Sequence, residues 1–290
     1  MINKPLPTVS ANGLTLPVLG QGGWNLGDDP ARADDEKAAL RHGLTLGLTL
    51  IDTAEMYGDG RSEYLIGQAL ADISRDSFQL CSKVYPHNAG RPTLIQSCDA
   101  SLRRLNTDYL DLYLLHWPGD IPLAETVNGM EELIRAGKIR RWGVSNFDVG
   151  DMEALWRTPG GDRCAVNQVL YHLGSRGVEY DLLPWLRTHN VAMMAYCPLA
   201  QGGTLRRTRQ DFLTDPTLCA VAQKYNASIM QVMLAFVLRQ QGVTAIPKAG
   251  HALHVEQNAQ ALTLNISLAD WQAIDDVFWP PSSKMHLDIE

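Results

Sequence analysis

Short apolar runs with strand character recur eight times along the 290-residue chain, and helical patterns separate them. The runs span residues 18–22, 48–51, 78–82, 109–115, 141–144, 164–167, 191–195 and 243–246. Each crossover is long enough to connect two parallel strands, which cannot be joined by a tight turn. Strand and helix in eightfold alternation predict an α/β fold, the (β/α)8 or TIM barrel.

Several connecting segments carry the pattern of amphipathic helices. The apolar side chains of residues 94–105 fall on one helical stripe, as do those of residues 229–237. Ser228 precedes the second of these helices and Gln231 follows three residues later, which is a capping-box pattern. The other predicted helices span residues 34–46, 62–71, 124–136, 151–156, 181–189, 253–260 and 268–277.

A β-hairpin is predicted ahead of the first run, because Asn12-Gly13 favours the positive φ angles of a two-residue turn. The main alternative to a barrel is a doubly wound open sheet, whose first strand usually leads into a GxGxxG turn and a helix. Here residues 20–24 read Gly-Gln-Gly-Gly-Trp, with no third glycine in place and no helix beginning there. We therefore predict a single barrel domain over residues 1–290.

Charge and composition narrow the classes of partner. The formal net charge of −7 is spread along the chain, which argues against a nucleic-acid or anionic-membrane surface. No apolar run approaches the roughly 20 residues that span a bilayer, and the N-terminus has no signal-peptide pattern. Five cysteines without CxxC spacing disfavour disulfides and structural zinc. We expect a cytoplasmic monomer with a small-molecule partner.

Polar residues stand where the predicted strands end, and in a (β/α)8 barrel these ends form the active site. Asp52, Lys83 and His116 follow the second, third and fourth runs, and Tyr57 lies five residues beyond Asp52. The remaining strand ends carry Gly22-Gly23-Trp24, Ser145-Asn146, Gln168, Tyr196 and Pro247-Lys248. We expect all of these residues to meet at one rim.

The first four residues can carry out proton transfer. A buried lysine needs a counterion, so Asp52 is expected to pair with Lys83. The ammonium group should lower the pKa of Tyr57 from its ordinary value of about 10, which would make the phenol a general acid. A neutral His116 could donate a hydrogen bond to a substrate oxygen. Together they would polarise a carbonyl group, but a reduction would also need a hydride cofactor.

Sequence motifs around these residues resemble those of the aldo-keto reductase family. The resemblance runs in order from about residue 16 to residue 271, with family spacing. The stretch 171–177 is similar to bacterial members that reduce methylglyoxal. The motifs that carry the family resemblance lie at residues 47–58, 82–84, 101–113, 115–118, 137–140, 143–147, 167–168, 196–200 and 246–248.

The resemblance implies an NADPH-dependent reductase of small aldehydes and ketones that has no Rossmann domain. The family's catalytic tetrad falls on Asp52, Tyr57, Lys83 and His116, with Tyr57 as proton donor. Side chains after the fifth to seventh strands would hold the nicotinamide, and the loop 199–203 would approach the pyrophosphate. The implied cofactor residues are Gly22, Gly23, Ser145, Asn146, Gln168, Tyr196, Pro198, Leu199, Gln201, Gly202, Lys248, His254, Gln257 and Asn258.

The 2′-phosphate of NADPH needs cationic partners. Lys248 matches the family's phosphate lysine, but many relatives carry an arginine six positions on, where this chain has His254. Gln257 likewise replaces a glutamate. Because a guanidinium group that could bind a phosphate with two hydrogen bonds is missing there, the prediction is NADPH with NADH as an open alternative.

The substrate pocket is expected above the tetrad, with small loops that suit small carbonyl compounds. Met56 and Tyr171 are further candidates for its lining, and a tail that begins with Trp279-Pro280-Pro281 is a candidate cap. The predicted substrate-binding residues are Trp24, Tyr57, Tyr85, His116 and Trp117.

The sequence leaves three alternative functions. A nicotinamide-binding regulatory subunit on the same fold would have less need of Tyr57. A barrel that uses Lys83 as a Schiff-base nucleophile would need no nucleotide. A metal-dependent hydrolase is disfavoured because the eight histidines form no ligand cluster at a strand end, so no metal site is predicted.

Overall fold

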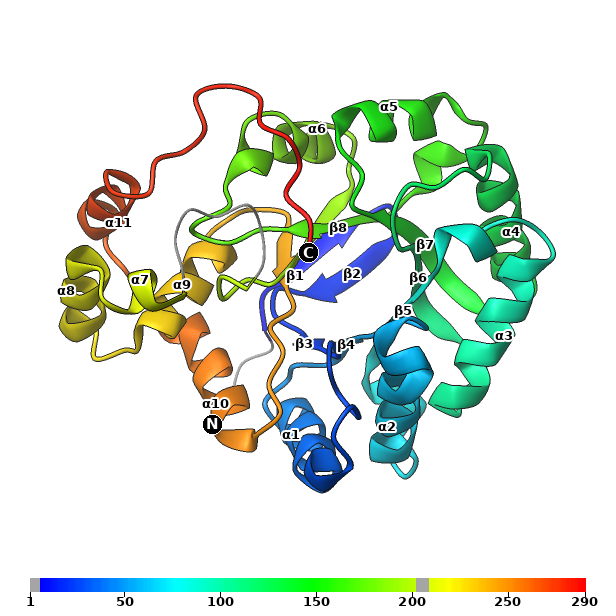
Figure 1. Cartoon of the computed structure of the whole chain (residues 1–290), viewed down its shortest axis with the longest axis horizontal. Helices are drawn as coiled ribbons and strands as arrows, with labels where there is room; N and C mark the ends of the chain where they lie inside the picture. The colour runs from blue at the N-terminus through cyan, green and yellow to red at the C-terminus, as the bar shows by residue number, and fades with distance from the viewer. Residues whose placement is uncertain (1–5, 202–208) are drawn as a thin grey trace.

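The computed structural model describes residues 6–201 and 209–290 of the chain. Eight parallel strands hydrogen-bond in sequence order to form its central sheet, and the helices surround them (Figure 1). The strands are β3 (Gln21–Gly22), β4 (Leu50–Asp52), β5 (Gln79–Val84), β6 (Leu110–Leu115), β7 (Ile139–Ser145), β8 (Val166–Leu170), β9 (Ala192–Tyr196) and β10 (Val243–Ala245).

The sheet closes on itself between its first and last strands. Two parallel bridges, Leu19 to Ala245 and Gly22 to Lys248, join the segments that contain β3 and β10. The backbone N–H of Gly20 donates to the carbonyl oxygen of Ala245 at 2.8 Å. The predicted (β/α)8 barrel is therefore confirmed, and the doubly wound alternative is wrong. The first strand is shorter than predicted because residues 18–20 contribute only these bridges and hydrogen bonds.

Helices stand at each of the predicted positions, with ends shifted by a few residues. They are α1 (Ala33–Thr45), α2 (Arg61–Leu70), α3 (Thr93–Leu105), α4 (Leu123–Arg135), α5 (Val149–Arg157), α6 (Leu182–Thr188), α9 (Ile229–Leu238), α10 (Ala252–Gln260) and α11 (Leu268–Asp275). The capping box predicted at Ser228 and Gln231 is present.

Two helices near residue 215 were not predicted, α7 (Arg209–Leu213) and α8 (Pro216–Lys224). The sequence does carry a signal for α8. Asp215 accepts hydrogen bonds from the backbone N–H groups of Thr217 and Leu218, and Pro216 occupies the first turn. An aspartate cap followed by proline is typical of a helix start.

The predicted N-terminal hairpin, β1 (Thr8–Ala11) and β2 (Leu14–Pro17), packs against the interior of the barrel. Asn12 and Gly13 have φ angles of 43° and 73°, as the two-residue turn requires. The alternate apolar side chains of the hairpin join one cluster with Leu50, Leu112 and Leu114 from the barrel strands. A larger apolar cluster fills the layer between strands and helices. This packing leaves the opposite end of the barrel for polar groups.

None of the helices described in the structure combines the length and the apolar character needed to cross a membrane.

Candidate active site

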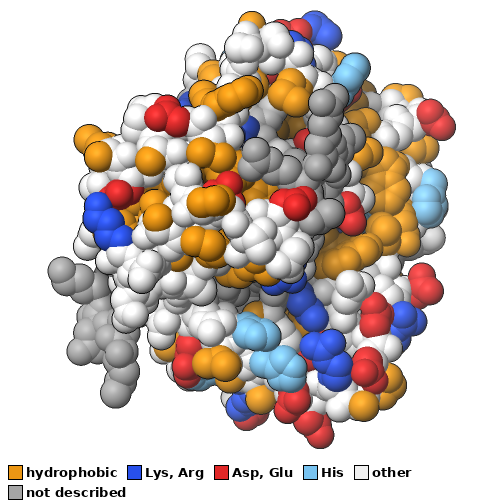
Figure 2. Space-filling view, turned by 60° about the vertical axis from the view of Figure 1, so that its left-hand side comes forward, with side chains coloured by type: hydrophobic (Ala, Val, Ile, Leu, Met, Phe, Trp, Pro, Cys, Tyr) orange, Lys and Arg blue, Asp and Glu red, His pale blue; other side chains and the backbone are white. Residues whose placement is uncertain are grey.

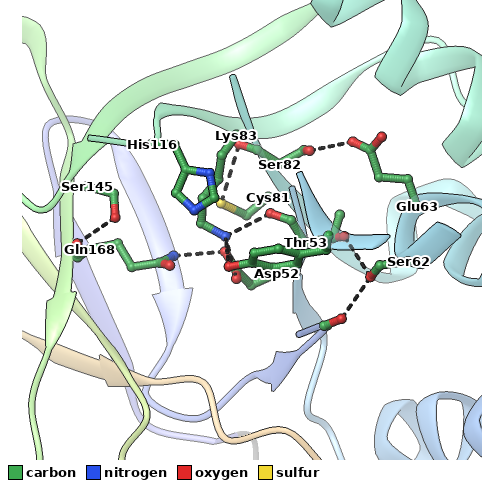
Figure 3. Close-up of polar contacts among 12 residues, drawn as sticks. Asp52, Thr53, Ser62, Glu63, Cys81, Ser82, Lys83, His116, Ser145 and Gln168 are labelled. Atoms are coloured by element: carbon green, nitrogen blue, oxygen red, sulfur yellow. Dashed lines mark hydrogen bonds and ion pairs between the residues drawn. The ribbon is translucent and has the colours of Figure 1, made fainter. Parts of the chain in front are cut away.

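Lys83 lies at the centre of a buried polar network at the ends of β4 and β5 (Figure 3). Its Nζ donates to Asp52 Oδ2 at 2.7 Å, to the carbonyl oxygen of Thr53 at 2.8 Å and to the Tyr57 hydroxyl at 3.0 Å. The Lys83 side chain is fully buried, and that of Asp52 is 2% exposed. Three acceptors therefore satisfy the three N–H bonds of the ammonium group, which offsets the cost of burying its charge.

Asp52 is held from a second direction by β8. Gln168 Nε2 donates to Asp52 Oδ1 at 2.8 Å, and the backbone oxygen of Gln168 accepts from Ser145 Oγ, also at 2.8 Å. Figure 3 shows Gln168 reaching the carboxylate from the left and Lys83 from above. Each Asp52 oxygen therefore has its own donor, which fixes the carboxylate orientation.

A tight turn after β4 brings Tyr57 back over Lys83. Gly58, Asp59 and Gly60 have positive φ angles of 58°, 52° and 86°, a conformation that glycine adopts without steric cost. The Tyr57 ring packs edge-on against Trp24, with centroids 4.8 Å apart. The sequence Gly-Asp-Gly is therefore part of what places the phenol.

The predicted lowering of the Tyr57 pKa is wrong. Burial raises the pKa of Tyr57 to about 12, because a phenolate loses its hydration in this site. The charge of Lys83 acts in the opposite direction and that of Asp52 in the same one, and burial has the largest effect. The tyrosine is therefore a neutral phenol at physiological pH, with its proton available for donation.

Lys83 is protonated and His116 is neutral, as the sequence predicts. Burial by itself would lower the pKa of Lys83, but Asp52 and then Tyr57 raise it above its ordinary value, so the amine stays protonated. Burial, followed by the charge of Lys83, lowers the pKa of His116 to about 2. The imidazole is thus neutral, and its buried Nδ1 has no hydrogen-bond partner among the described residues.

A cavity of about 360 Å³ opens over the tetrad and carries residues from both predicted binding sets. From the predicted substrate set, Trp24, Tyr57, His116 and Trp117 line it, together with Met56. The cofactor residues that line it are Gly22, Gly23, Ser145, Asn146, Gln168, Tyr196, Pro198, Gln201 and Lys248. The structure thus brings most of the predicted site to one cavity.

The chemistry of this lining fits a nicotinamide dinucleotide. Near the tetrad, Asn146 and Tyr196 lie side by side, since the Tyr196 hydroxyl donates to Asn146 Oδ1 at 2.8 Å. Amide and hydroxyl groups suit a carboxamide, and an aromatic face suits a planar ring. Lys248 adds the cation that a phosphate group requires. Its side chain is 25% exposed and is therefore accessible to a ligand.

Comparison with known proteins decides the family. The sequence profile described as the aldo/keto reductase family matches residues 18–278. The chain belongs to the aldo/keto reductase family. Its membership confirms the predicted enzyme class, an aldo-keto reductase.

Several relatives of this reductase are similar over almost their whole length. Methylglyoxal reductase YeaE of Escherichia coli (strain K12) is 54% identical over 276 residues, which cover 95% of this chain and 96% of the relative. An aldo/keto reductase from Klebsiella pneumoniae in complex with NADP and acetate is 50% identical, with a TM-score of 0.94 over 98% of this chain and all of that one. A second structure from Klebsiella pneumoniae, in complex with NADPH, is also 50% identical and has a TM-score of 0.93 with both chains fully covered.

Some predicted residues of the reductase lie outside the cavity lining. Tyr85 is a neighbour of that lining, because its ring packs edge-on against Trp117 at 5.8 Å. Gly202 falls in residues 202–208, outside the described part of the chain. The predicted cofactor residues that do not line the cavity are Leu199, His254, Gln257 and Asn258.

Two aromatic residues near the expected pocket, Tyr171 and Trp279, lie outside its lining. Tyr171 is fully buried away from the cavity, where its hydroxyl donates to Glu179 at 2.7 Å. Trp279 is 76% exposed and does not line the cavity, but the tail that it begins does reach the cavity, because Glu290 at the far end of the tail is part of the lining. In both cases the sequence suggests that an aromatic residue lies near the pocket, but it does not specify the direction in which the side chain points.

The cavity also contains residues that the sequence analysis missed, namely Asn25, Cys197, Ile246 and Glu290. The backbone N–H of Glu290 donates to the Tyr196 hydroxyl at 3.3 Å. Lys284, which belongs to the same tail, is paired with Asp148 and Asp181 and also holds the tail against the barrel. No local sequence pattern indicates such a return path, whereas Cys197 follows directly after the predicted Tyr196 and adjacency could have indicated it.

Proposed function

We propose that this reductase converts small aldehydes and ketones of the methylglyoxal type to alcohols with NADPH, and that Tyr57 is the proton donor. The observation that carries the proposal is the contact of 3.0 Å between Lys83 Nζ and the Tyr57 hydroxyl, directly beneath an aromatic-lined cavity. NADPH, when bound, supplies the hydride. Ser145, Asn146 and Tyr196 would hold its nicotinamide end, and Lys248 its phosphate end.

The tetrad residues would act on the carbonyl oxygen of the substrate. His116 is neutral, so the N–H of its ring can donate a hydrogen bond that orients the substrate oxygen. No positive charge on the imidazole has to be buried in the pocket. Tyr57 holds its proton until negative charge develops on the oxygen, which then becomes more basic than a phenolate. Proton transfer from the Tyr57 hydroxyl to this oxygen completes the alcohol.

Lys83 and Asp52 would stabilise the Tyr57 anion that remains. The ammonium group already donates to the phenol oxygen, so little reorganisation is needed when the proton leaves. Asp52 keeps the lysine protonated, and Gln168 holds Asp52. Gln168 would therefore position the tetrad as well as border the cofactor.

The size and lining of the cavity favour small substrates. Trp24, Met56 and Trp117 form apolar walls around the reacting end. The relative from Escherichia coli is named a methylglyoxal reductase, and its 54% identity supports the same substrate class here.

The competing functions fit the site less well. A nicotinamide-binding regulatory subunit would not need a phenol, an ammonium and an imidazole arranged for proton transfer. A Schiff-base mechanism would need a free amine in the cavity, whereas Lys83 is a protonated amine with three acceptors and is absent from the cavity lining.

Steady-state oxidation of NADPH with methylglyoxal tests the proposal, with wild type and Tyr57→Phe compared and NADH run in parallel. The phenylalanine keeps the ring and removes the proton, so kcat should fall roughly 10²- to 10⁴-fold while the affinity for NADPH is retained. Trp156→Phe, a ring change on α5 outside the cavity, is the matched control. Equal, slow rates in wild type and Tyr57→Phe would contradict the proposed function.

A further inference from the structure

Two cationic side chains converge on Gly250, which lies two residues beyond Lys248, a residue of the cavity lining. Arg32 ends the short 3₁₀ helix η1 (Pro30–Arg32) just before α1, and Gly250 stands just before α10. A Cβ atom built on Gly250 would lie 2.8 Å from Arg32 Nη2 and 3.4 Å from Lys248 Nζ. Both cations are thus in contact distance of the same point, although more than half of the chain separates them in sequence.

The surrounding carboxylates do not neutralise both cations. Glu36 is buried and lies 3.7 Å from Lys248 Nζ, while its other oxygen accepts from the N–H of Gly27 at 2.9 Å. Asp28 is paired with Arg61, and Asp35 lies 3.6 Å from His251. Arg32 itself forms no ion pair within residues 6–201 and 209–290, so one positive charge is left over beside Lys248.

The electrostatics of Lys248 agree with this surplus. Burial lowers the pKa of Lys248, Glu36 raises it, and the nearby charge of Arg32 lowers it again, with a net decrease from the ordinary value. Two cations that repel each other, of which Lys248 alone has a carboxylate within 4 Å among the described residues, gain when an anion binds between them. The pair therefore has the charge of an anion site.

The backbone around the pair adds to its affinity for anions. α10, a helix of nine residues, begins at Ala252, and the side chain of its N-cap residue, His251, makes no capping hydrogen bond. The positive end of the helix dipole and the open N–H groups favour a phosphate there. In Figure 2, blue lysine or arginine side chains lie beside pale-blue histidines in the lower half of the displayed face, with red carboxylate side chains around them.

We propose that Arg32 binds the 2′-phosphate of NADPH together with Lys248 and thereby sets the preference for NADPH over NADH. The proposal rests on the proposed function, because it assumes that the nucleotide lies in this cavity, which Lys248 lines. Arg32 supplies from the start of α1 the guanidinium group that is missing at His254 in α10. His254 is exposed, and its ring lies edge-on to that of His251 at 5.9 Å.

The test is equilibrium binding, without turnover. Quenching of tryptophan fluorescence would give the Kd for NADPH and for NADH in wild type, Arg32→Ala and the control Arg157→Ala, an exposed arginine on α5. Loss of charge-assisted hydrogen bonds should weaken NADPH binding about tenfold or more. The Kd for NADH should stay within about twofold of wild type, because NADH has no 2′-phosphate. Adenosine 2′,5′-bisphosphate should compete with NADPH more strongly than AMP does in wild type and in the control. In Arg32→Ala the two competitors should be similar in strength.

Each other outcome contradicts the proposal in a recognisable way. If Arg32→Ala binds NADPH as wild type does, Arg32 is not a phosphate ligand, while the proposed function stands. If Arg32→Ala weakens the binding of NADPH and NADH equally, Arg32 contacts a group that is present in both nucleotides. If wild type binds neither nucleotide, the proposed function fails and this proposal with it. A thermal melt of each variant shows that the fold is kept, as expected for an exposed arginine without an ion pair.

Discussion

The tetrad and the Lys248 side of the cavity use lysine in opposite ways. Lys83, at the tetrad end, is fully buried and donates to three acceptors within 3.0 Å. Lys248, on the other side, has a side chain that is 25% exposed, and the acceptor nearest to it in the described ion pairs is Glu36 at 3.7 Å. Both lysines stand at strand ends of one barrel, yet one is a fixed part of the protein and the other is available to a ligand.

This difference follows from what each end has to do. Proton transfer needs groups that are already oriented before the reaction, and burial with full hydrogen bonding provides that. Recognition of a phosphate needs cations that are incompletely paired, because a satisfied cation has little to gain from a new anion. Variants that break one end should therefore change chemistry or stability, and variants at the other end should change nucleotide affinity.

The largest effect is expected from Lys83→Met, which breaks the tetrad end. Methionine fills similar space but leaves the buried Asp52 without its counterion, so the free energy of unfolding should fall by about 3–5 kcal/mol. Urea denaturation monitored by circular dichroism would measure it. The double variant Asp52→Asn/Lys83→Met should recover part of the loss. A single variant as stable as wild type would show that the pair is not a tightly coupled unit.

A smaller effect is expected from pH, and its sign follows from His116. In the folded protein, the pKa of His116 is lowered to about 2, whereas the unfolded chain takes up a proton near the ordinary value of 6.5. The unfolded state binds more protons between these values, so stability should fall as the pH drops below about 6.5, by up to about 1.4 kcal/mol per pH unit. Denaturation midpoints measured from pH 7 to pH 4 would show it.

The matched control for the pH experiment is His116→Gln, which cannot titrate in this range. Its stability should depend less steeply on pH than that of wild type. Equal slopes would show that His116 is not the neutral buried group that the structure describes.

The smallest effect is expected from Gly250→Ala at the Lys248 end. The added methyl group would stand 2.8 Å from Arg32 Nη2, and a long exposed side chain can swing away with little effect on stability. NADPH binding should then weaken by roughly two- to fivefold, with no change for NADH, since part of the charge-assisted bond is lost. The same titrations as for Arg32→Ala would measure this, and a parallel change for NADH would contradict it.

Much of the fold could be predicted because its determinants are local and repeated. Apolar runs, helical stripes and the Asn12-Gly13 turn each act over a few residues, and eightfold repetition leaves the barrel as the architecture that satisfies them all. The strand-end residues followed from that, because parallel strands in a barrel end at the same rim. The first strand is shorter than predicted, and helix α8 was missed, because the local signals there are weak or were overlooked.

The sequence by itself therefore determined the barrel, the family and the order of Asp52, Tyr57, Lys83 and His116 along the rim. Only the tertiary structure decided how far each group is buried, and burial rather than the neighbouring ammonium sets the direction of the Tyr57 pKa. The tertiary structure also brought Arg32 to Lys248. The physical reason is the same in both cases: desolvation and charge pairing depend on distances in space, which barrel closure sets between residues far apart in the chain.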